Sequence, residues 1–357
     1  MQFSFNFKIK TLIAFAPSDI YQPAYERTTP AEIRDVNYLL LLGTHDRQVP
    51  SILGSRVYQR VHFSNPGAIS PYYMKAALYI HGGNHSQFNT DWGIYDFPWL
   101  YRLFTNMKDQ LSADEQHQIV KVCVSSFLDA TLKDDKRYIS FFRDYRTIDE
   151  WLPRTAYISR FQDSAFRALA DFDEDIDPAT ATIPGGEVIG RDLSQWHEQD
   201  IDYHYFLPFG SRGNRVVSIG WEARKKSSPM WGIRLPANAV HSLRLKPSDN
   251  LTFSLFCPDQ KGLPDISIQL SDSRGRTSKL PLSDIITLQK PLHYSLTKFD
   301  FLEKPSPVII LQTVSIPFSR FLRSNPLFNL KRLHEIDFLF NSENDGTVLL
   351  DDIGIEK

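Results

Sequence analysis

Apolar residues in the first third of the chain form continuous runs separated by a segment with helical spacing. The runs cover 9–16, 36–43 and 75–81, and none of them alternates with polar residues. Such runs are typical of parallel strands that are buried on both faces of a sheet. Between the second and third runs, the apolar positions of 50–63 predict a crossover helix. This order predicts right-handed βαβ units in a parallel sheet.

A longer helix is expected after the third strand. Ser112 and Glu115 have the spacing of a capping box, and Ile119 and Cys123 lie on one apolar face. Residues 133–180 are charged and aromatic with little periodicity, which predicts a packed connector that ends in a solvated acidic loop. Three parallel strands are too few for a doubly wound sheet with two covered faces. We therefore expect this region to be one end of a larger sheet.

The pattern changes at about residue 181, where short strands begin to alternate with turn signals. This spacing is typical of an antiparallel β-sandwich. The expected strands are 216–221, 230–235, 251–257, 266–270, 308–314, 335–340 and 347–353. The predicted fold class is α/β, a partial parallel sheet, plus an all-β sandwich. We place the first domain at 1–165 and the second at 166–357.

Composition narrows the classes of function. The 357 residues contain 40 Lys and Arg against 42 Asp and Glu, a net charge of −2, which argues against a nucleic-acid partner. The hydrophobic fraction of 42% is sufficient for buried cores. No run approaches the roughly 18 apolar residues of a membrane span, so no membrane partner is expected. Cys123 and Cys257 fit no disulfide framework or metal spacing and are expected to be buried.

Polar residues follow two of the predicted parallel strands directly. Residues 43–50 (GTHDRQVP) come after the second strand, and residues 82–89 (GGNHSQFN) come after the third. Because the carboxyl ends of parallel strands meet at one edge of a sheet, we expect Asp46 and His85 to lie close together. A carboxylate fixes the tautomer of an imidazole and stabilises its protonated form, so the second ring nitrogen can act as a general base.

These two loops resemble the acid and histidine loops of the α/β-hydrolase family, in which both residues follow the nucleophile along the chain. The strand-Gly-x-x-Asp-x-x-Val pattern around Asp46 resembles the acid loop. The Gly-x-Asn-His-x-Gln-Phe-Asn stretch around His85 resembles the histidine loop of an esterase branch related to dienelactone hydrolases, chlorophyllases and polyester hydrolases. The resemblance covers about residues 1–160. It implies that Asp46 is the triad acid and His85 the base, that the substrate is a small or polymeric ester, and that no cofactor takes part.

The nucleophile of such a triad is missing, because no Gly-x-Ser-x-Gly occurs in the chain. Only 45 residues precede Asp46, so we expect an N-terminally truncated serine ester hydrolase that is inactive in this form. Ser211 and Ser273 lie in elbow-like fragments (GSRG and SRG), but both are downstream among turn residues and are not expected to be nucleophiles. The compartment stays open, since a secretion signal would have been lost with the N-terminus.

Structural explanations of the same residues also stay open. Asp46 can cap the helix expected from Pro50, and His85 can bond a backbone carbonyl in a tight turn. Asp19, after the first strand, is a second candidate for the acid. His81 and His85 are four residues apart but lie on a glycine loop rather than a helix, so zinc chemistry of the HExxH type has no scaffold and no metal is expected.

The C-terminal stretches 333–340 and 346–354 resemble the last two strands of galactose-binding-like jelly rolls, which often close carbohydrate-binding modules. Residues 185–187 and 193–196 fit the matching first strand. The resemblance implies the alternative function, a non-catalytic protein that binds a glycan on its β-sandwich. Exposed aromatic rings stack on sugars, although the same rings can fill the sandwich core. The candidates are Trp196, Tyr203, Trp221 and Trp231.

The sequence also leaves two further binding partners as alternatives, a metal ion and a second protein chain. Asp351 and Asp352 are candidates for a structural Ca²⁺ ion, which prefers carboxylate oxygens. A separate chain can also supply the strands that the parallel sheet lacks, because an uncovered sheet edge otherwise promotes aggregation.

Overall fold

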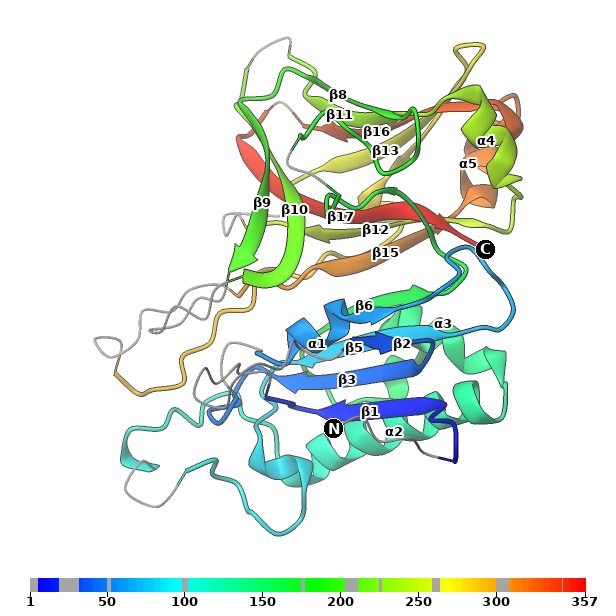
Figure 1. Ribbon diagram of the computed structural model, residues 1–357. Coiled ribbons are helices and arrows are strands. Elements are labelled where there is room, and N and C mark those ends of the chain that lie inside the picture. The colour runs from blue at the N-terminus through cyan, green and yellow to red at the C-terminus, as the bar shows by residue number, and fades with distance from the viewer. Residues whose placement is uncertain are drawn as a thin grey trace. The chain divides into compact units, whose positions relative to one another are not determined.

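The computed structural model divides the chain into two compact units. Unit 1 comprises residues 1–164, 202–212 and 293–308, and unit 2 comprises residues 165–201, 213–292 and 309–357. The structure describes residues 6–18, 32–49, 53–97, 102–174, 177–202, 211–224, 227–258, 264–299, 308–341 and 343–357. Each unit has its own β-structure (Figure 1).

A four-stranded sheet organises unit 1. Its strands, in spatial order, are β1 (Thr11–Phe15), β3 (Asn37–Gly43), β5 (Met74–Ile80) and β6 (Tyr157–Asp163). The first three are parallel, and β6 pairs antiparallel with β5. The three apolar runs of the sequence therefore form neighbouring parallel strands. Every residue of β3 and β5 is buried, as their uninterrupted apolar character requires.

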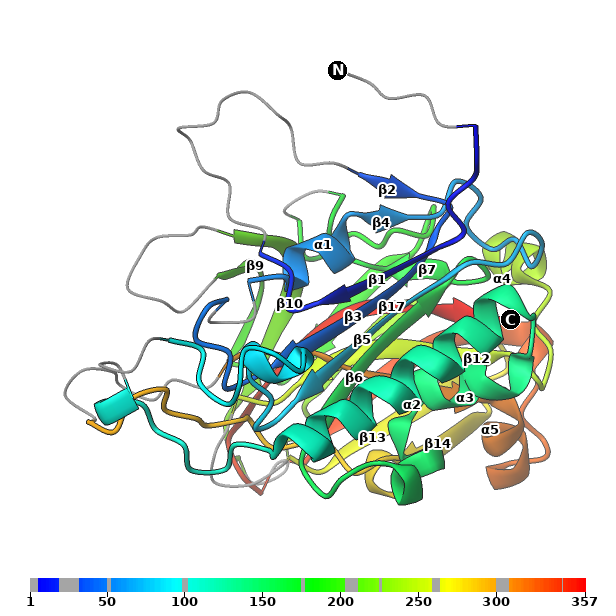
Figure 2. The same cartoon turned by 90° about the horizontal axis from the view of Figure 1, so that it is seen from below.

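Two helices cover one face of this sheet (Figure 2). Helix α2 (Ala113–Leu132) begins at the predicted capping box, in which Ser112 and Glu115 exchange hydrogen bonds. Helix α3 (Ile139–Arg143) follows it. Between and around them lie the 3₁₀ turns η3 (Ser86–Phe88), η5 (Lys136–Tyr138) and η6 (Tyr145–Trp151). The core between helices and sheet includes Leu39, Leu41, Leu78, Ile119, Cys123, Phe127, Phe141 and Phe161.

Two segments of unit 1 differ from the prediction. The helix expected over 50–63 is reduced to α1 (Ser55–Gln59), because the chain then enters β4 (Val61–His62), which pairs with β2 (Ile33–Arg34). The aperiodic connector contains strand β6. Backbone pairing with β5 defines β6. Its charged residues interrupt the apolar pattern, so the sequence did not predict a strand there.

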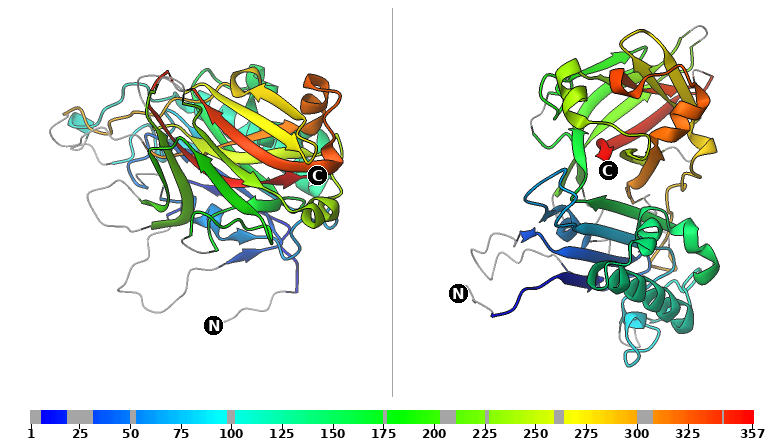
Figure 3. Two further views of the ribbon diagram at one scale, coloured as in Figure 1. Left: turned by 90° about the horizontal axis from the view of Figure 1, so that it is seen from above. Right: turned by 90° about the vertical axis from the view of Figure 1, so that its right-hand side faces the viewer.

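Unit 2 is a sandwich of two sheets with antiparallel pairing, as predicted (Figure 3). The strands are β7 (Arg167–Ala170), β8 (Glu187–Arg191), β9 (Gln195–Asp202), β10 (Ser211–Trp221), β11 (Met230–Arg234), β12 (Asn250–Phe256), β13 (Ile266–Asp272), β14 (Thr277–Pro281), β15 (Gln312–Pro317), β16 (Leu333–Phe340) and β17 (Gly346–Glu356). One sheet has the order β15-β12-β17-β10-β9, with β7 also paired to β17. The other sheet has the order β14-β13-β16-β11-β8.

Short helices close one end of the sandwich, where α4 (Ala237–Leu243) and α5 (Phe318–Ser324) lie (Figure 3). The 3₁₀ turns η7 (Leu282–Asp284) and η8 (Leu330–Arg332) complete the connections. Each strand expected from the sequence overlaps an observed one. β15 is displaced furthest, from 308–314 to 312–317.

The inner faces of the two sheets enclose a large apolar core. Trp221 and Trp231 are only 2% and 0% exposed, so the core explanation applies to both and neither ring is available to stack on a sugar. This corrects two of the four aromatic candidates. Trp196 is partly buried and packs against the same core, and Tyr203 lies outside the described residues.

Candidate functional site

Glycines bring the loops after β3 and β5 into backbone contact. A Cβ atom at Gly43 would collide with the carbonyl oxygen of Gly83, so a larger residue does not fit there. Gly82 has a φ of +82°, a conformation that favours glycine. The amide of His45 donates to the carbonyl of Gly83 at 2.8 Å. The residues that follow both strands therefore meet at one edge of the sheet.

Asp46 and His85 contact each other at this edge. Asp46 Oδ2 and His85 Nδ1 are 3.0 Å apart, and their side chains are 2% and 18% exposed. Asp46 Oδ1 accepts hydrogen bonds from the backbone amides of Gln48 and Val49, at 2.9 and 2.7 Å. Asp46 thus orders its own loop with one oxygen and binds the imidazole with the other. It does not cap α1, whose N-cap is Gly54.

The hydrogen bond defines which nitrogen of His85 is available. A carboxylate oxygen accepts, so Nδ1 donates and Nε2 carries the lone pair of the neutral ring. Within the described residues, Nε2 has no hydrogen-bond partner, and no serine or threonine hydroxyl contacts it. The bond from Asp46 raises the pKa of His85 above its ordinary value, burial opposes this, and the charges of Asp46 and Asp96 add to it. The pair has the arrangement of an oriented base.

Asp96 ties the two loops together, and the sequence did not point to it. Its Oδ2 accepts from the amides of Arg47 at 2.9 Å and His85 at 3.3 Å, and its Oδ1 accepts from the amide of Ser86 at 2.9 Å. The side chain is 5% exposed. One carboxylate thus binds backbone of both loops. No local motif marks it, because its partners come from two other segments.

Further buried polar residues form hydrogen bonds with the loops after β3 and β5. Gln116 of α2 accepts from the Asn84 amide at 3.0 Å and donates to the Asn84 carbonyl at 2.8 Å. His45 Nε2 lies 2.9 Å from the carbonyl of Lys108, and its Nδ1 lies 3.0 Å from the hydroxyl of Thr44. Since a carbonyl only accepts, Nε2 donates and Nδ1 accepts. Burial lowers the pKa of His45 to about 4, which fits this neutral form.

An aromatic ring covers the imidazole. Trp92 stacks on His85 with ring centroids 5.9 Å apart and an interplanar angle of 11°. Trp92 itself is 61% exposed. Other exposed apolar side chains of unit 1 are Ile94, Phe97, Leu103, Phe104 and Phe299. The Asp46–His85 pair therefore has an aromatic ring on one side of the imidazole and the polar groups of its loops around the rest.

The other sequence candidates of unit 1 lie apart from the pair or outside the described residues. His81 Nδ1 lies 3.4 Å from the hydroxyl of Thr44 and does not join His85. Cys123 is buried in the core, which raises the pKa of its thiol. Asp19 is outside the described residues.

Ser273 lies in the turn between β13 and β14, and Ser211 is the first residue of β10, so neither is on an elbow between a strand and a helix. Asp351 Oδ2 accepts from the side-chain amide of Asn214 at 2.9 Å, and Asp352 Oδ2 accepts from the hydroxyl of Ser254 at 3.3 Å. The described residues contain no group of three or more His, Cys, Asp or Glu that could hold a metal ion.

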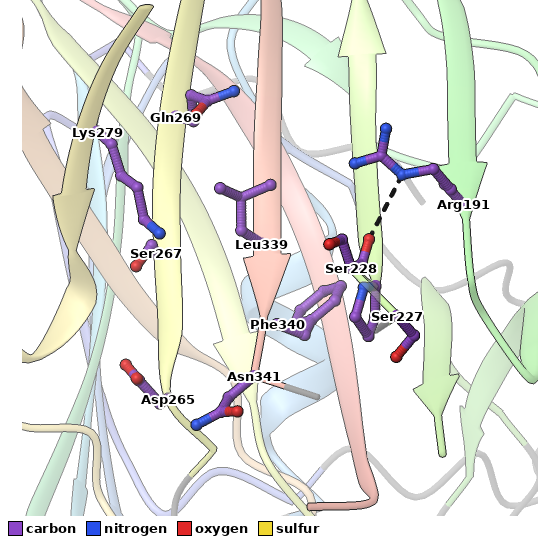
Figure 4. Close-up of a pocket in the computed structure, with 11 residues that line it drawn as sticks. Arg191, Ser227, Ser228, Asp265, Ser267, Gln269, Lys279, Leu339, Phe340 and Asn341 are labelled. Atoms are coloured by element: carbon purple, nitrogen blue, oxygen red, sulfur yellow. Dashed lines mark hydrogen bonds between the residues drawn. The ribbon is translucent and has the colours of Figure 1, made fainter. Parts of the chain in front are cut away.

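Unit 2 carries a second candidate site, a cavity of about 440 Å³ on the outer face of its five-stranded sheet (Figure 4). Alternate residues of β13 point into the core, and the intervening Ser267 and Gln269 line the cavity. Lys279 of β14, Leu339 of β16 and Arg191 of β8 also line it. Its volume is within the range of small-ligand sites, about 300–1,000 Å³.

Asp337 lies on β16 directly opposite Gln269. Its Oδ2 is 3.4 Å from Gln269 Nε2, whereas its buried Oδ1 has no hydrogen-bond partner among the described residues. A Cβ at Gly232, its neighbour on β11, would lie 2.5 Å from that Oδ1, so the glycine makes room for the carboxyl group. Burial, with a contribution from Glu335, raises the pKa of Asp337 to about 6.

Comparisons with known proteins do not assign a function to either candidate site. No family model and no curated protein matches the chain. Among solved structures, a family 30 carbohydrate-binding module is 15% identical, covering 46% of this chain and 77% of its own, with a TM-score of 0.30. The family 11 carbohydrate-binding module of a Clostridium thermocellum cellulosomal cellulase is 14% identical over 54% and 94%, also with a TM-score of 0.30.

A β-1,2-glucanase from Parabacteroides distasonis is 13% identical, covering 53% of this chain and 24% of its own, with a TM-score of 0.32. These values are too low to transfer a ligand to this chain. The β-sandwich stands on the strand pairing of unit 2 itself. Separately, none of the described helices combines the length and apolar composition of a membrane span.

Proposed function

We propose that the protein binds carbohydrate without catalysis and that the cavity on the five-stranded sheet is the binding site. The observation that carries the proposal is the polar lining of a cavity of about 440 Å³ on a rigid sheet. Sugar hydroxyls both donate and accept hydrogen bonds. Gln269, Ser267 and Asn341 supply both kinds of partner, and Leu339 offers apolar contact to the C–H face of a ring.

A glycan array followed by affinity electrophoresis of the full chain tests this proposal. We expect retention by at least one polysaccharide and loss of that retention in Q269A, because the amide lines the cavity between Lys279 and Arg191. T277A is the matched control, since Thr277 is exposed on β14 but does not line the cavity. Failure to bind any polysaccharide on the array would contradict the proposal.

We also propose a second function, that Asp46 and His85 are the acid and base of a serine ester hydrolase of the α/β-hydrolase type. The distance of 3.0 Å and the unoccupied Nε2 support it. Without a nucleophile elbow, this chain is expected to be inactive on esters. In this proposal the acid–base pair belongs to a domain at 1–165, and glycan binding to a domain at 166–357.

A fluorophosphonate probe tests the expected inactivity. The purified chain should show no stoichiometric serine labelling, while an intact serine esterase in the same assay is labelled completely. Stoichiometric labelling of one serine would overturn this expectation. The H85N variant would then tell whether the labelled serine depends on His85.

A further inference from the structure

The cavity on the five-stranded sheet has a positive charge at each of two borders. Arg191 comes from β8 and Lys279 from β14, the two outermost strands of the sheet. Figure 4 shows them on opposite sides of Gln269 and Leu339. Four steps of about 4.8 Å between strands separate their backbones by roughly 19 Å. Only a ligand that lies across several strands meets both side chains.

Neither cation has a carboxylate within ion-pair distance among the described residues, although the charge of Arg191 acts on Asp337. Arg191 Nε donates to the carbonyl of Ser228 at 3.5 Å, and within the described residues neither Arg191 nor Lys279 forms an ion pair. Arg234, on the same face of the sheet, provides the contrast. Its guanidinium pairs with Glu335 at 2.9 Å and with Glu187 at 3.3 Å. Arg234, outside the cavity lining, therefore has two ion pairs, whereas the two cations at the borders of the cavity have none among the described residues.

Two acidic groups lie in or beside the cavity lining, Asp265 and Asp337. Asp265 is the one carboxylate among the lining residues, so the lining carries two positive charges against one negative charge. Asp337 lies beside Gln269 on the neighbouring strand β16 and is not among the lining residues, but its charge acts on Arg191. The lining itself therefore has an excess of one positive charge, with both cations free of ion pairs among the described residues.

We propose that this cavity selects an anionic saccharide, with a carboxylate or sulfate group at Arg191 or Lys279 and sugar hydroxyls at Gln269 and Ser267. The proposal rests on the carbohydrate-binding function above and specifies its ligand class. A guanidinium binds planar oxyanions with two parallel hydrogen bonds, whereas an ammonium acts as a point charge. Arg191 is therefore the main determinant of selectivity, and Lys279 adds a contribution that depends more on ionic strength.

Asp337 acts as a positioning residue for this ligand. Its carboxyl group accepts from Gln269 Nε2, so the amide oxygen of Gln269 is left to accept from a sugar hydroxyl. The lining thus offers cations for the acidic group and an oriented acceptor for a hydroxyl. A neutral sugar can use the oriented hydrogen-bond acceptor but not the two cations.

Isothermal titration calorimetry of the full chain tests the proposal with three probes of equal length: an oligogalacturonate, a sulfated galactan oligosaccharide and a neutral galactan oligosaccharide. We expect at least one anionic probe to bind about tenfold more tightly than the neutral probe at 50 mM NaCl, with a smaller ratio at 300 mM. R191Q should remove most of this preference, and K279Q should remove a smaller part of it. R234Q is the matched control and should retain it.

The outcomes separate the two proposals. If the neutral probe binds as tightly as both anionic probes and Q269A abolishes binding, the anionic selectivity is wrong and the carbohydrate-binding function stands. If poly-glutamate binds as tightly as the anionic saccharides, the cavity is an anion site and the saccharide assignment is wrong. If no probe binds and the glycan array is also empty, both proposals fail. The relative affinities of the two anionic probes distinguish a uronate ligand from a sulfated one.

Discussion

Asp46 in unit 1 and Asp337 in unit 2 are both buried carboxyl groups, 2% and 3% exposed, but their surroundings differ. Asp46 accepts hydrogen bonds from two backbone amides with one oxygen and from an imidazole with the other. Asp337 accepts one long hydrogen bond from Gln269, and its second oxygen has no partner among the described residues. The two carboxyl groups are equally buried, but only Asp46 has hydrogen-bond partners for both of its oxygens.

This difference shows why burial alone does not tell what a carboxyl group does. A buried polar group without a partner costs about 1–3 kcal/mol, whereas a fully bonded one stabilises its surroundings. Asp46 therefore orders the edge of the parallel sheet. Asp337 destabilises its own sheet when ionised, which is the pattern expected where a ligand site is retained against stability.

The largest effect is expected from Asp46→Ala. The change leaves the amides of Gln48 and Val49 and the imidazole of His85 without their acceptor, and each polar group left unpaired in a buried setting costs about 1–3 kcal/mol. Urea unfolding of the full chain should show this loss, and hydrogen exchange should rise at the amides of Gln48 and Val49. D46N is the control and should lose less, because its amide oxygen still accepts. A D46A protein within about 1 kcal/mol of the wild type would contradict the role of Asp46.

His45 is a third buried titratable group, and unlike the two carboxyl groups it is neutral at pH 7 in the folded protein. Burial lowers its pKa to about 4, against an ordinary value near 6.5. The unfolded chain binds the proton first, so the contribution of His45 to stability is present above pH 6.5 and is lost as the pH falls towards 4. The loss amounts to about 3 kcal/mol. Unfolding free energies at pH 7 and pH 4.5 should therefore differ less in H45Q than in the wild type, and equal pH slopes would exclude this role.

Asp337→Asn is expected to stabilise unit 2. The raised pKa means that the folded state holds the proton more tightly, so the destabilisation by the ionised group is full above pH 6 and disappears as the pH falls to about 4. The gain in D337N should be roughly 1–3 kcal/mol at pH 7.5 and close to zero at pH 4. Urea titrations at the two pH values measure it. D337N as unstable as D46A would mean that the two carboxyl groups do not differ as described.

The sequence predicted the strands and the long helix correctly wherever the apolar pattern coincides with the observed backbone pairing. The runs that became β1, β3 and β5 are uninterrupted, and the capping box of Ser112 and Glu115 marks the start of α2. It failed for β6, whose residues Arg160 and Asp163 break any apolar pattern, because pairing with β5 defines the strand. It also failed over 50–63, where helical spacing gave way to β4.

The candidate site was predictable in part. Strand ends and loop residues were enough to place Asp46 beside His85, because the geometry of parallel strands is local and regular. Asp96, His45 and the cavity were not foreseen. Asp96 acts on two loops that belong to other segments of the chain, and the cavity needs the register of five strands before Arg191 and Lys279 can be placed on one face.

The smallest effect concerns the tuning of His85 rather than stability. The hydrogen bond from Asp46 raises the pKa of the imidazole, so its contribution to stability is full below about pH 6.5 and is lost as the pH rises through the raised value. In D46N the carboxylate charge is gone, and the pKa of His85 should fall towards or below its ordinary value because burial then dominates. D96N should lower it less, since Asp96 acts on the ring through its charge alone. NMR titration of the imidazole resonances in the three proteins measures the order. A His85 pKa that is unchanged in D46N would show that the pair is an incidental contact and would remove the electrostatic support for its proposed role as a base.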